Sequence, residues 1–197
     1  KWWCRSGVEG VVCISAHIEA MMAPAWAESA TPPILKTLHD PVVVPSSPAP
    51  DHRDARAEAR KRYHVESNAV VLGFIGQIAP IKGVKELLAA CEPLTSRPDW
   101  TLLIAGRDPQ PGRPYENECR QWVSDRGLGD RVRFVGFLDD VREFYRAIDV
   151  AVVPSLKEPL GLIPLEAGAA GKPSIADRKS TRLNSSHSQQ SRMPSSA

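Results

Sequence analysis

Between residues 69 and 176, short apolar runs alternate regularly with segments of helical character. Uninterrupted apolar runs are typical of parallel strands that are buried on both faces of a sheet. Strands that alternate with helices predict βαβ units, so we expect an α/β fold with a doubly wound parallel sheet. The predicted strands span 69–76, 100–106, 132–135 and 150–153, with a last strand from Ser174, and the predicted helices span 83–91, 114–126, 140–148 and 162–170.

The first 50 residues have a different character. An apolar run at 10–15 and a helical candidate at 16–29 predict the last strand and helix of an upstream domain, of which 1–29 would be a fragment. Residues 30–50 contain six prolines, which predicts a linker with one extended piece at 42–44.

Residues 51–64 are charged and predict a helix with Asp51 as its N-cap. The basic side chains could bind an anionic partner. A solvated helix face, on which they pair with acidic residues four positions away, is the better interpretation. The alternating domain therefore spans 51–176. The four cysteines lack the spacing of a metal or redox site, which favours free thiols in a reducing, cytoplasmic compartment.

The last 21 residues have an unusual origin on our interpretation. Residues 177–187 and 191–197 match the translation, in one frame, of two blocks of a common short-read sequencing adapter, and 188–190 would be the sample index. We expect 177–197 to be a non-native disordered tail on a truncated chain, with a natural Ser-rich tail as the alternative. Residues 1–176 carry 21 basic and 22 acidic residues, a net charge of −1 instead of +2. The charge therefore gives no indication of a nucleic-acid partner.

Two strand ends in the first half of the domain carry glycine-rich loops. One holds Gly76, Gln77, Lys82 and Gly83, and its spacing fits neither a dinucleotide fingerprint nor a P-loop. A lysine at a helix start suits a phosphate, because its charge adds to that of the helix N–H groups. An ordinary helix-start lysine is the alternative. Gly106 follows the next strand and either lets a ligand approach the backbone or only makes the turn.

The most informative motif follows the strand at 150–153. It contains Glu158, Gly161, Leu162 and Glu166. Ligands in open α/β sheets bind beyond the carboxyl ends of the strands. Gly161 leaves the amides of a helix that begins at Leu162 uncovered, and Glu166 lies about 6–7 Å along that helix. Both carboxylates can reach a polyhydroxylated ligand; the alternative is a capping Glu158 and an exposed Glu166.

The whole pattern resembles the retaining nucleotide-sugar glycosyltransferases of family 4, which have the GT-B fold. The resemblance covers about residues 10–176. It implies that 51–176 is an incomplete, Rossmann-like donor-binding half of that fold, and that 1–29 is the end of the acceptor-side half. The motifs occur in family order and are Gly76-Gln77-(x)4-Lys82-Gly83, Leu103-Ile104-Ala105-Gly106, Val132-Arg133-Phe134-Val135-Gly136 and Pro154-Ser155-(x)2-Glu158-(x)2-Gly161-(x)4-Glu166-Ala167-(x)3-Gly171-Lys172-Pro173.

The resemblance also implies individual roles. Glu158 would contact the donor sugar, Glu166 the nucleotide ribose and Lys82 the donor diphosphate, with Lys82 and Glu158 as the catalytic candidates. Gln77 stands where many members have an arginine on the diphosphate, so a charge-assisted contact of about 1.5–3 kcal/mol is missing. The donor-binding set is completed by Gly76, Gly106, Gly161 and Leu162.

The implied reaction is transfer of a glycosyl group from a UDP- or GDP-linked sugar, a substrate and not a cofactor, to an acceptor with retention of configuration. The sequence contains no Asp-x-Asp motif, so we expect no metal. The acceptor is open, and peripheral membrane contact is expected only through the missing N-terminal domain. We expect the fragment to be inactive alone. The alternatives are a nucleotide-binding domain without transfer activity, or another GT-B enzyme such as a nucleotide-sugar epimerase.

Overall fold

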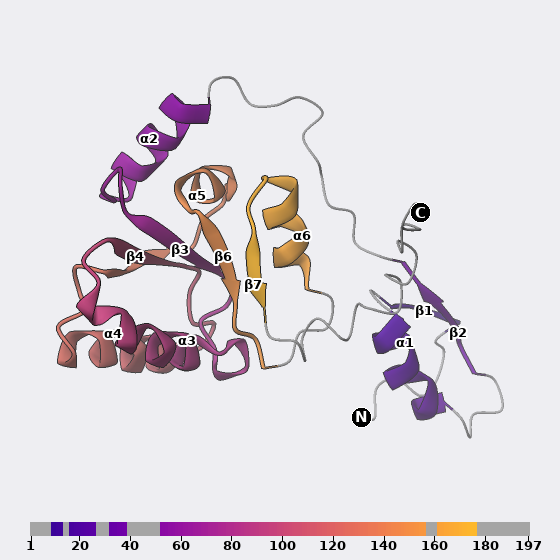
Figure 1. Cartoon of the computed structure of the whole chain (residues 1–197). Coiled ribbons are helices and arrows are strands. Elements are labelled where there is room, and N and C mark those ends of the chain that lie inside the picture. Colours follow the sequence, from indigo (N-terminus) through magenta and orange to yellow (C-terminus); the bar gives the residue numbers. More distant parts are fainter. Residues whose placement is uncertain (1–8, 14–15, 27–31, 39–51, 157–160, 177–197) are drawn as a thin grey trace, which may run out of the picture.

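The computed structural model describes residues 9–13, 16–26, 32–38, 52–156 and 161–176. Most of them form an α/β unit with five parallel strands flanked by helices (Figure 1). This confirms the predicted fold class, and each predicted strand or helix end from residue 69 onward lies within two residues of the observed one. The elements are α2 (His52–Arg62), β3 (Val70–Ile75), η2 (Pro80–Lys82), α3 (Val84–Cys91), η3 (Glu92–Ser96), β4 (Trp100–Ala105), α4 (Pro114–Asp125), β5 (Val132–Gly136), α5 (Arg142–Ala147), β6 (Val150–Val153), α6 (Leu162–Ala169) and β7 (Ser174–Ala176).

The strand order positions the site. The sheet runs β5-β4-β3-β6-β7, and every neighbouring pair is parallel. The chain therefore builds outward from β3 to β5 and then returns to place β6 on the other side of β3. Such a reversal is a topological switch point, where the loops after the two central strands diverge and leave a crevice for a ligand. The loops after β3 and β6 flank this point.

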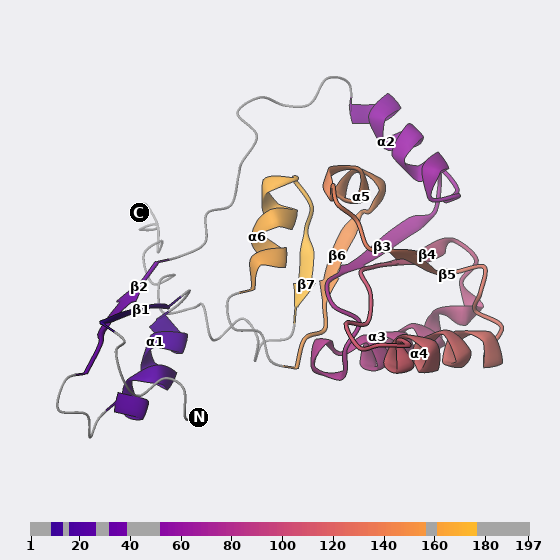
Figure 2. The ribbon, with the colours of Figure 1, turned by 180° about the vertical axis from the view of Figure 1, so that it is seen from behind.

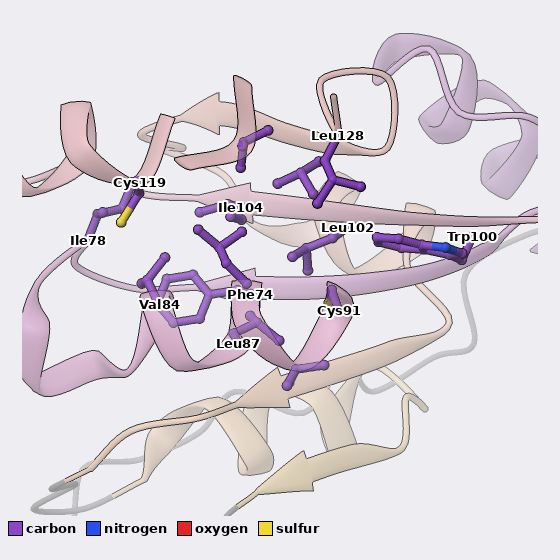
Figure 3. Close-up of a cluster of buried hydrophobic side chains, with 14 residues drawn as sticks. Phe74, Ile78, Val84, Leu87, Cys91, Trp100, Leu102, Ile104, Cys119 and Leu128 are labelled. Atoms are coloured by element: carbon purple, nitrogen blue, oxygen red, sulfur yellow. The ribbon is translucent and has the colours of Figure 1, made fainter. Parts of the chain in front are cut away.

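Helices cover both faces of the sheet, as the two views in Figures 1 and 2 show. Side chains alternate along β4, which is buried throughout. Leu102 and Ile104 pack with α3 and α4, in the cluster drawn in Figure 3. Leu103 and Ala105 pack with residues of α2, α5 and α6 in a second cluster. The centre of the sheet is thus buried on both sides, as its continuous apolar strands predict, whereas the edge strand β7 is mostly exposed. Cys13, Cys91 and Cys119 are buried free thiols, and burial raises the pKa of the Cys91 thiol to about 11.

Helix α5 and the residue that follows it pack directly on β3. A Cβ at Gly73, in the middle of β3, would lie 2.6 Å from Ile148 Cγ2 and 3.1 Å from Phe144 Cε1. Phe144 and Ile148 are fully buried. Glycine at position 73 therefore allows α5 to lie directly on the central strand, next to α6.

A buried arginine ties α2 to the sheet. Arg60 is 2% exposed, and its guanidinium donates to the carbonyl oxygens of Ser67 (2.7 Å), Ala69 (3.0 Å) and Ala147 (3.1 Å). It also forms an ion pair of 2.6 Å with Asp149, which accepts a hydrogen bond from the Val71 backbone N–H. Arg60 thus connects α2 to the segments that enter β3 and β6.

The N-terminal described residues form a separate small unit. Strand β1 (Gly10–Cys13) pairs in parallel with β2 (Ile34–Thr37), and α1 (Ala16–Met22) and η1 (Ala23–Trp26) lie between them in the chain. The Thr37 hydroxyl donates a hydrogen bond to Glu19 of α1. The structure therefore differs from the predicted linker over residues 34–37, a proline-free piece of the segment 30–50. The predicted extended piece at 42–44 and the N-cap at Asp51 lie outside the described residues.

Candidate functional site

The loops that follow β3 and β6 contact each other at the switch point. A Cβ at Gly83 would lie only 2.1 Å from the Pro154 carbonyl oxygen, so the two backbones touch where glycine has no side chain. Beside this contact, the Leu156 backbone N–H donates to the Ile81 carbonyl oxygen at 3.0 Å. The segment that carries Lys82 is therefore held directly against the segment that leads toward α6.

Lys82 ends η2 and is half-buried. The following residue, Gly83, has φ 69° and ψ 29°, a left-handed conformation that both ends η2 and precedes α3. This conformation strains residues with a Cβ. The sequence Lys82-Gly83 thus turns the chain sharply at the carboxyl edge of the sheet and leaves the lysine there.

Gly76 and Gly106 lie at the ends of neighbouring strands. The Gly76 N–H donates to the Ala105 carbonyl oxygen at 3.1 Å, and the Gly106 N–H donates to the Gly136 carbonyl oxygen at 2.7 Å. A Cβ at Gly106, where φ is 125°, would lie 1.8 Å from the Gly76 carbonyl oxygen. Packing of one strand end on the next accounts for glycine at position 106.

A cleft of about 690 Å³ opens at these strand ends. Gly76, Gln77 and Gly106 line it together, and Gln77 is exposed. Its other lining residues come mainly from the loops after β4 and β5, including Arg107 and Phe137. The Arg107 guanidinium lies over the Phe137 ring, 4.9 Å from its centroid. Neither residue belongs to the predicted set of site residues, although Arg107 directly follows the predicted Gly106.

One wall of the cleft is fixed by a buried carboxylate. Asp108 is 4% exposed and accepts hydrogen bonds from the backbone N–H groups of Gln110 (2.9 Å), Tyr115 (2.9 Å) and Glu116 (3.3 Å). These hydrogen bonds, led by that of Gln110, lower the pKa of Asp108. The Glu116 carboxylate in turn accepts from the Asp108 N–H at 3.2 Å and pairs with Arg120 at 2.8 Å. This reciprocal arrangement joins the loop after β4 to the first turn of α4.

Helix α6 begins after a glycine N-cap. Its N-cap is Gly161, with φ 69° and ψ 52°, and among the described residues no side chain caps the helix. The backbone N–H groups of Leu162 and Ile163 lie in the first turn, whereas Pro164 has none. Uncapped N–H groups and the positive end of the helix dipole favour an anion. Glu158, predicted in the preceding loop, lies outside the described residues.

Glu166 lies one turn further along α6 and is half-buried. Its carboxylate accepts a hydrogen bond of 2.9 Å from the hydroxyl of Tyr145, on α5. Tyr145 is 3% exposed. Burial first, and then the charge and hydrogen bond of Glu166, raise the pKa of the Tyr145 hydroxyl. Tyr145 therefore remains a proton donor at neutral pH. No sequence pattern predicts this partner, which lies 21 positions away.

The structure therefore brings the predicted residues together only in part. Gly76, Gln77 and Gly106 share the cleft. Lys82 and Glu166 are not among its lining residues. Lys82 directly precedes Gly83, which contacts Pro154, whereas Glu166 lies on α6, separated from Pro154 by residues outside the described ranges. Within the described ranges, no three His, Cys, Asp or Glu side chains gather as metal ligands would. None of the helices among these residues has the length and apolar content required to cross a bilayer.

Comparison with known proteins identifies the family. The family model for glycosyl transferases group 1 matches residues 55–183. The chain belongs to this family. Among group 1 relatives, the lipopolysaccharide core biosynthesis mannosyltransferase LpsB of Rhizobium meliloti is 36% identical over 125 residues, which cover 61% of this chain and 35% of LpsB. A D-inositol 3-phosphate glycosyltransferase of Geodermatophilus obscurus is 36% identical over 128 residues, 61% of this chain and 28% of that protein.

Solved structures share the fold of this group 1 chain. Anabaena HepE, solved with UDP and glucose, superposes with a TM-score of 0.73 at 23% identity and covers 87% of this chain and 45% of its own. The C-terminal domain of the group 1 protein LpcC from Francisella tularensis gives a TM-score of 0.56 at 31% identity over 66% of each chain. The chain spans about a third of the length of the curated relatives that it matches.

Proposed function

We propose that this chain contains the donor-binding half of a retaining family 4 glycosyltransferase, which transfers a sugar from a nucleotide sugar to an acceptor. The observation that carries the proposal is the contact between the Lys82 segment and the segment leading to α6 at the switch point of the sheet. In the proposal, the Lys82 side chain and the glycine-capped N-terminus of α6 both lie near this contact. Both suit the diphosphate of a nucleotide sugar.

The chemical task is to stabilise negative charge on the departing nucleoside diphosphate. In the proposal, Lys82 and the amides of Leu162 and Ile163 stabilise that charge as fixed donors, which need no rearrangement during the reaction. This arrangement does not require a divalent cation. Glu158 contacts the donor sugar, and Glu166 accepts hydrogen bonds from the ribose hydroxyls.

The names of similar proteins support the proposed donor class. HepE was solved with UDP-glucose as well as with UDP and glucose, and LpsB is named as a mannosyltransferase. We therefore propose a UDP- or GDP-linked hexose as the donor, leaving the acceptor open. Cytoplasmic location and peripheral membrane contact of the full-length protein remain part of the proposal.

Gln77 motivates a second candidate function. It lies in the exposed cleft as a neutral side chain, where the family resemblance places an arginine. A domain that binds nucleotide without transferring sugar would tolerate this loss of positive charge. Nucleotide binding and sugar transfer must therefore be measured separately.

The experiment measures turnover of UDP- and GDP-sugars and binding of UDP and GDP by the full-length gene product. Lys82→Ala should lower kcat/KM about 100-fold, since loss of a charge-assisted contact in the transition state corresponds to on the order of 3 kcal/mol. Glu166→Ala should weaken binding of UDP or GDP about tenfold. An unchanged rate for Lys82→Ala rejects its role, and nucleotide binding without turnover in the unmodified protein supports the second candidate.

We also propose that residues 177–197 are adapter-derived and that the chain is truncated. The family match runs to residue 183, beyond the predicted boundary at Ala176. The coding DNA tests this directly, because adapter origin requires the adapter's own codons across both matching blocks. Any other codons there contradict the interpretation.

A further inference from the structure

The most informative contact outside the predicted residues joins α5 to α6. Tyr145 is almost completely buried, and its ring packs in the same cluster as Ala151 of β6 and Ala167 of α6. It also meets Phe144 edge-on, with ring centroids 6.1 Å apart. Its hydroxyl donates to the half-buried Glu166. The core therefore fixes the position of this donor.

Glu166 alone would have considerable freedom. A glutamate side chain has three rotatable bonds, and fixing it costs about 1–2 kcal/mol of conformational free energy. Glu166 is only half-buried, so packing does not fix its carboxylate by itself. The hydrogen bond from Tyr145 holds Oε2. Oε1 is then the oxygen that remains for another donor, and a carboxylate can accept several hydrogen bonds.

We propose that Tyr145 positions Glu166, holding one carboxylate oxygen so that the other accepts a hydrogen bond from the ribose of the nucleotide. This inference rests on the proposed function, in which Glu166 contacts the ribose. Tyr145 itself does not touch the ligand and is a positioning residue. Its hydroxyl has an independent reason to need a partner, because a buried tyrosine O–H is nearly always hydrogen-bonded. The experiment must therefore separate positioning from simple satisfaction of a buried group.

The test is a comparison of ligands with and without ribose hydroxyls. In the full-length protein, isothermal titration measures the dissociation constants of UDP and GDP and of their 2′,3′-dideoxy counterparts. For whichever of UDP and GDP binds more tightly, the dissociation constant of the dideoxy ligand is divided by that of the ribose-containing ligand. This ratio reports the ribose contact alone. A variant that only loosens the core changes both constants together and leaves the ratio unchanged.

Tyr145→Phe keeps the ring and removes the hydroxyl. We expect it to weaken binding of the ribose-containing nucleotide about three- to tenfold, the usual range for one hydrogen bond, and to leave the dideoxy ligand within twofold. Glu166→Gln is the second variant, because its amide oxygen still accepts from Tyr145 while its NH₂ group faces the ribose. It should reduce the same ratio without a loss of thermal stability.

Tyr115→Phe is the matched control. The Tyr115 hydroxyl accepts a hydrogen bond from the Lys85 backbone N–H at 3.3 Å, and Tyr115 packs in the cluster on the other face of the sheet. It should leave the ratio unchanged. If Glu166→Ala and Glu166→Gln retain the full ratio, the ribose assignment fails, and the proposal about Tyr145 fails with it. If both reduce the ratio while Tyr145→Phe retains it, Glu166 contacts the ribose without help from Tyr145, and the positioning inference alone is overturned.

Discussion

Replacing Gly83 by alanine tests the contact between the two loops of the proposed donor site. The added Cβ would lie 2.1 Å from the Pro154 carbonyl oxygen and 2.9 Å from its carbonyl carbon. Real Cβ atoms essentially never come within 3.0 Å of another heavy atom, so the two backbones must separate by at least 0.9 Å, the difference between 3.0 and 2.1 Å. No rotation of a side chain can relieve this overlap, because the opposing atoms belong to the backbone.

The expected effect follows from that displacement. Lys82 directly precedes Gly83, and Pro154 leads into the segment before α6, so the proposed phosphate donors move apart. A misplacement of about 1 Å can lower a reaction rate on the order of 100-fold. The left-handed conformation adds about 1–2 kcal/mol of strain for alanine. We expect kcat/KM of the full-length protein to fall about 100-fold and its melting temperature to fall by several degrees.

The chain offers a matched control for this substitution. Gly127 has φ 62°, close to the 69° of Gly83, but a Cβ there would meet nothing within 4 Å. Gly127→Ala therefore carries the left-handed strain without the steric overlap. Sugar-transfer kinetics and thermal denaturation, measured by circular dichroism, are compared for both variants. Equal effects of Gly83→Ala and Gly127→Ala on kcat/KM would refute the close contact between Gly83 and Pro154.

Two further predictions concern stability. Arg60→Met should lower the free energy of unfolding by about 3 kcal/mol, the lower end of the range for a broken buried ion pair. The lower end applies because Asp149 keeps Arg56 and the Val71 N–H as partners. An unchanged midpoint of urea denaturation would contradict this. The pKa of Asp108 is lowered in the folded state, so its carboxylate stabilises the protein above the unfolded pKa of about 3.9, and this contribution is lost as the pH falls through the folded value. Asp108→Asn should therefore lower the melting temperature at pH 7, with a smaller difference below pH 4; a constant difference would refute the assignment.

The sequence predicts the fold well because its main signal is local. The strands are short apolar runs, and Gly83 and Gly161 stand where left-handed residues precede α3 and α6. Strand β2 was missed for a physical reason. Its four residues, Ile34–Thr37, lie in a proline-rich segment, and proline density suggests a linker. Their partner β1 lies more than 20 positions earlier, so this parallel pairing depends on tertiary contact and not on local pattern.

The site was predicted less completely than the fold. Gly76 and Gly106 could be predicted as candidate site residues because a glycine at the end of a strand indicates either a turn or a close approach to the backbone. Tyr145 could not, since an aromatic residue in an amphipathic helix is ordinarily explained by the core, and here it is indeed buried. What sequence alone does not show is which side chain faces its hydroxyl. Arg107 and Phe137 pose the same problem, because their contact joins the loops of two different strands.

The proposed donor site is supported from both faces of the sheet. Lys82 precedes α3, whose buried residues pack on one face, whereas Glu166 is held by α5, which packs on the other. These layers are separated by the strands, so neither helix can set the position of the other's ligand-facing residue directly. The connection runs through the loops at the switch point, where Gly83 meets Pro154 and the Leu156 N–H meets Ile81. In the proposed function, the placement of Lys82 relative to α6 therefore depends in part on backbone contacts at the edge of the sheet, and glycine at position 83 allows those contacts to form.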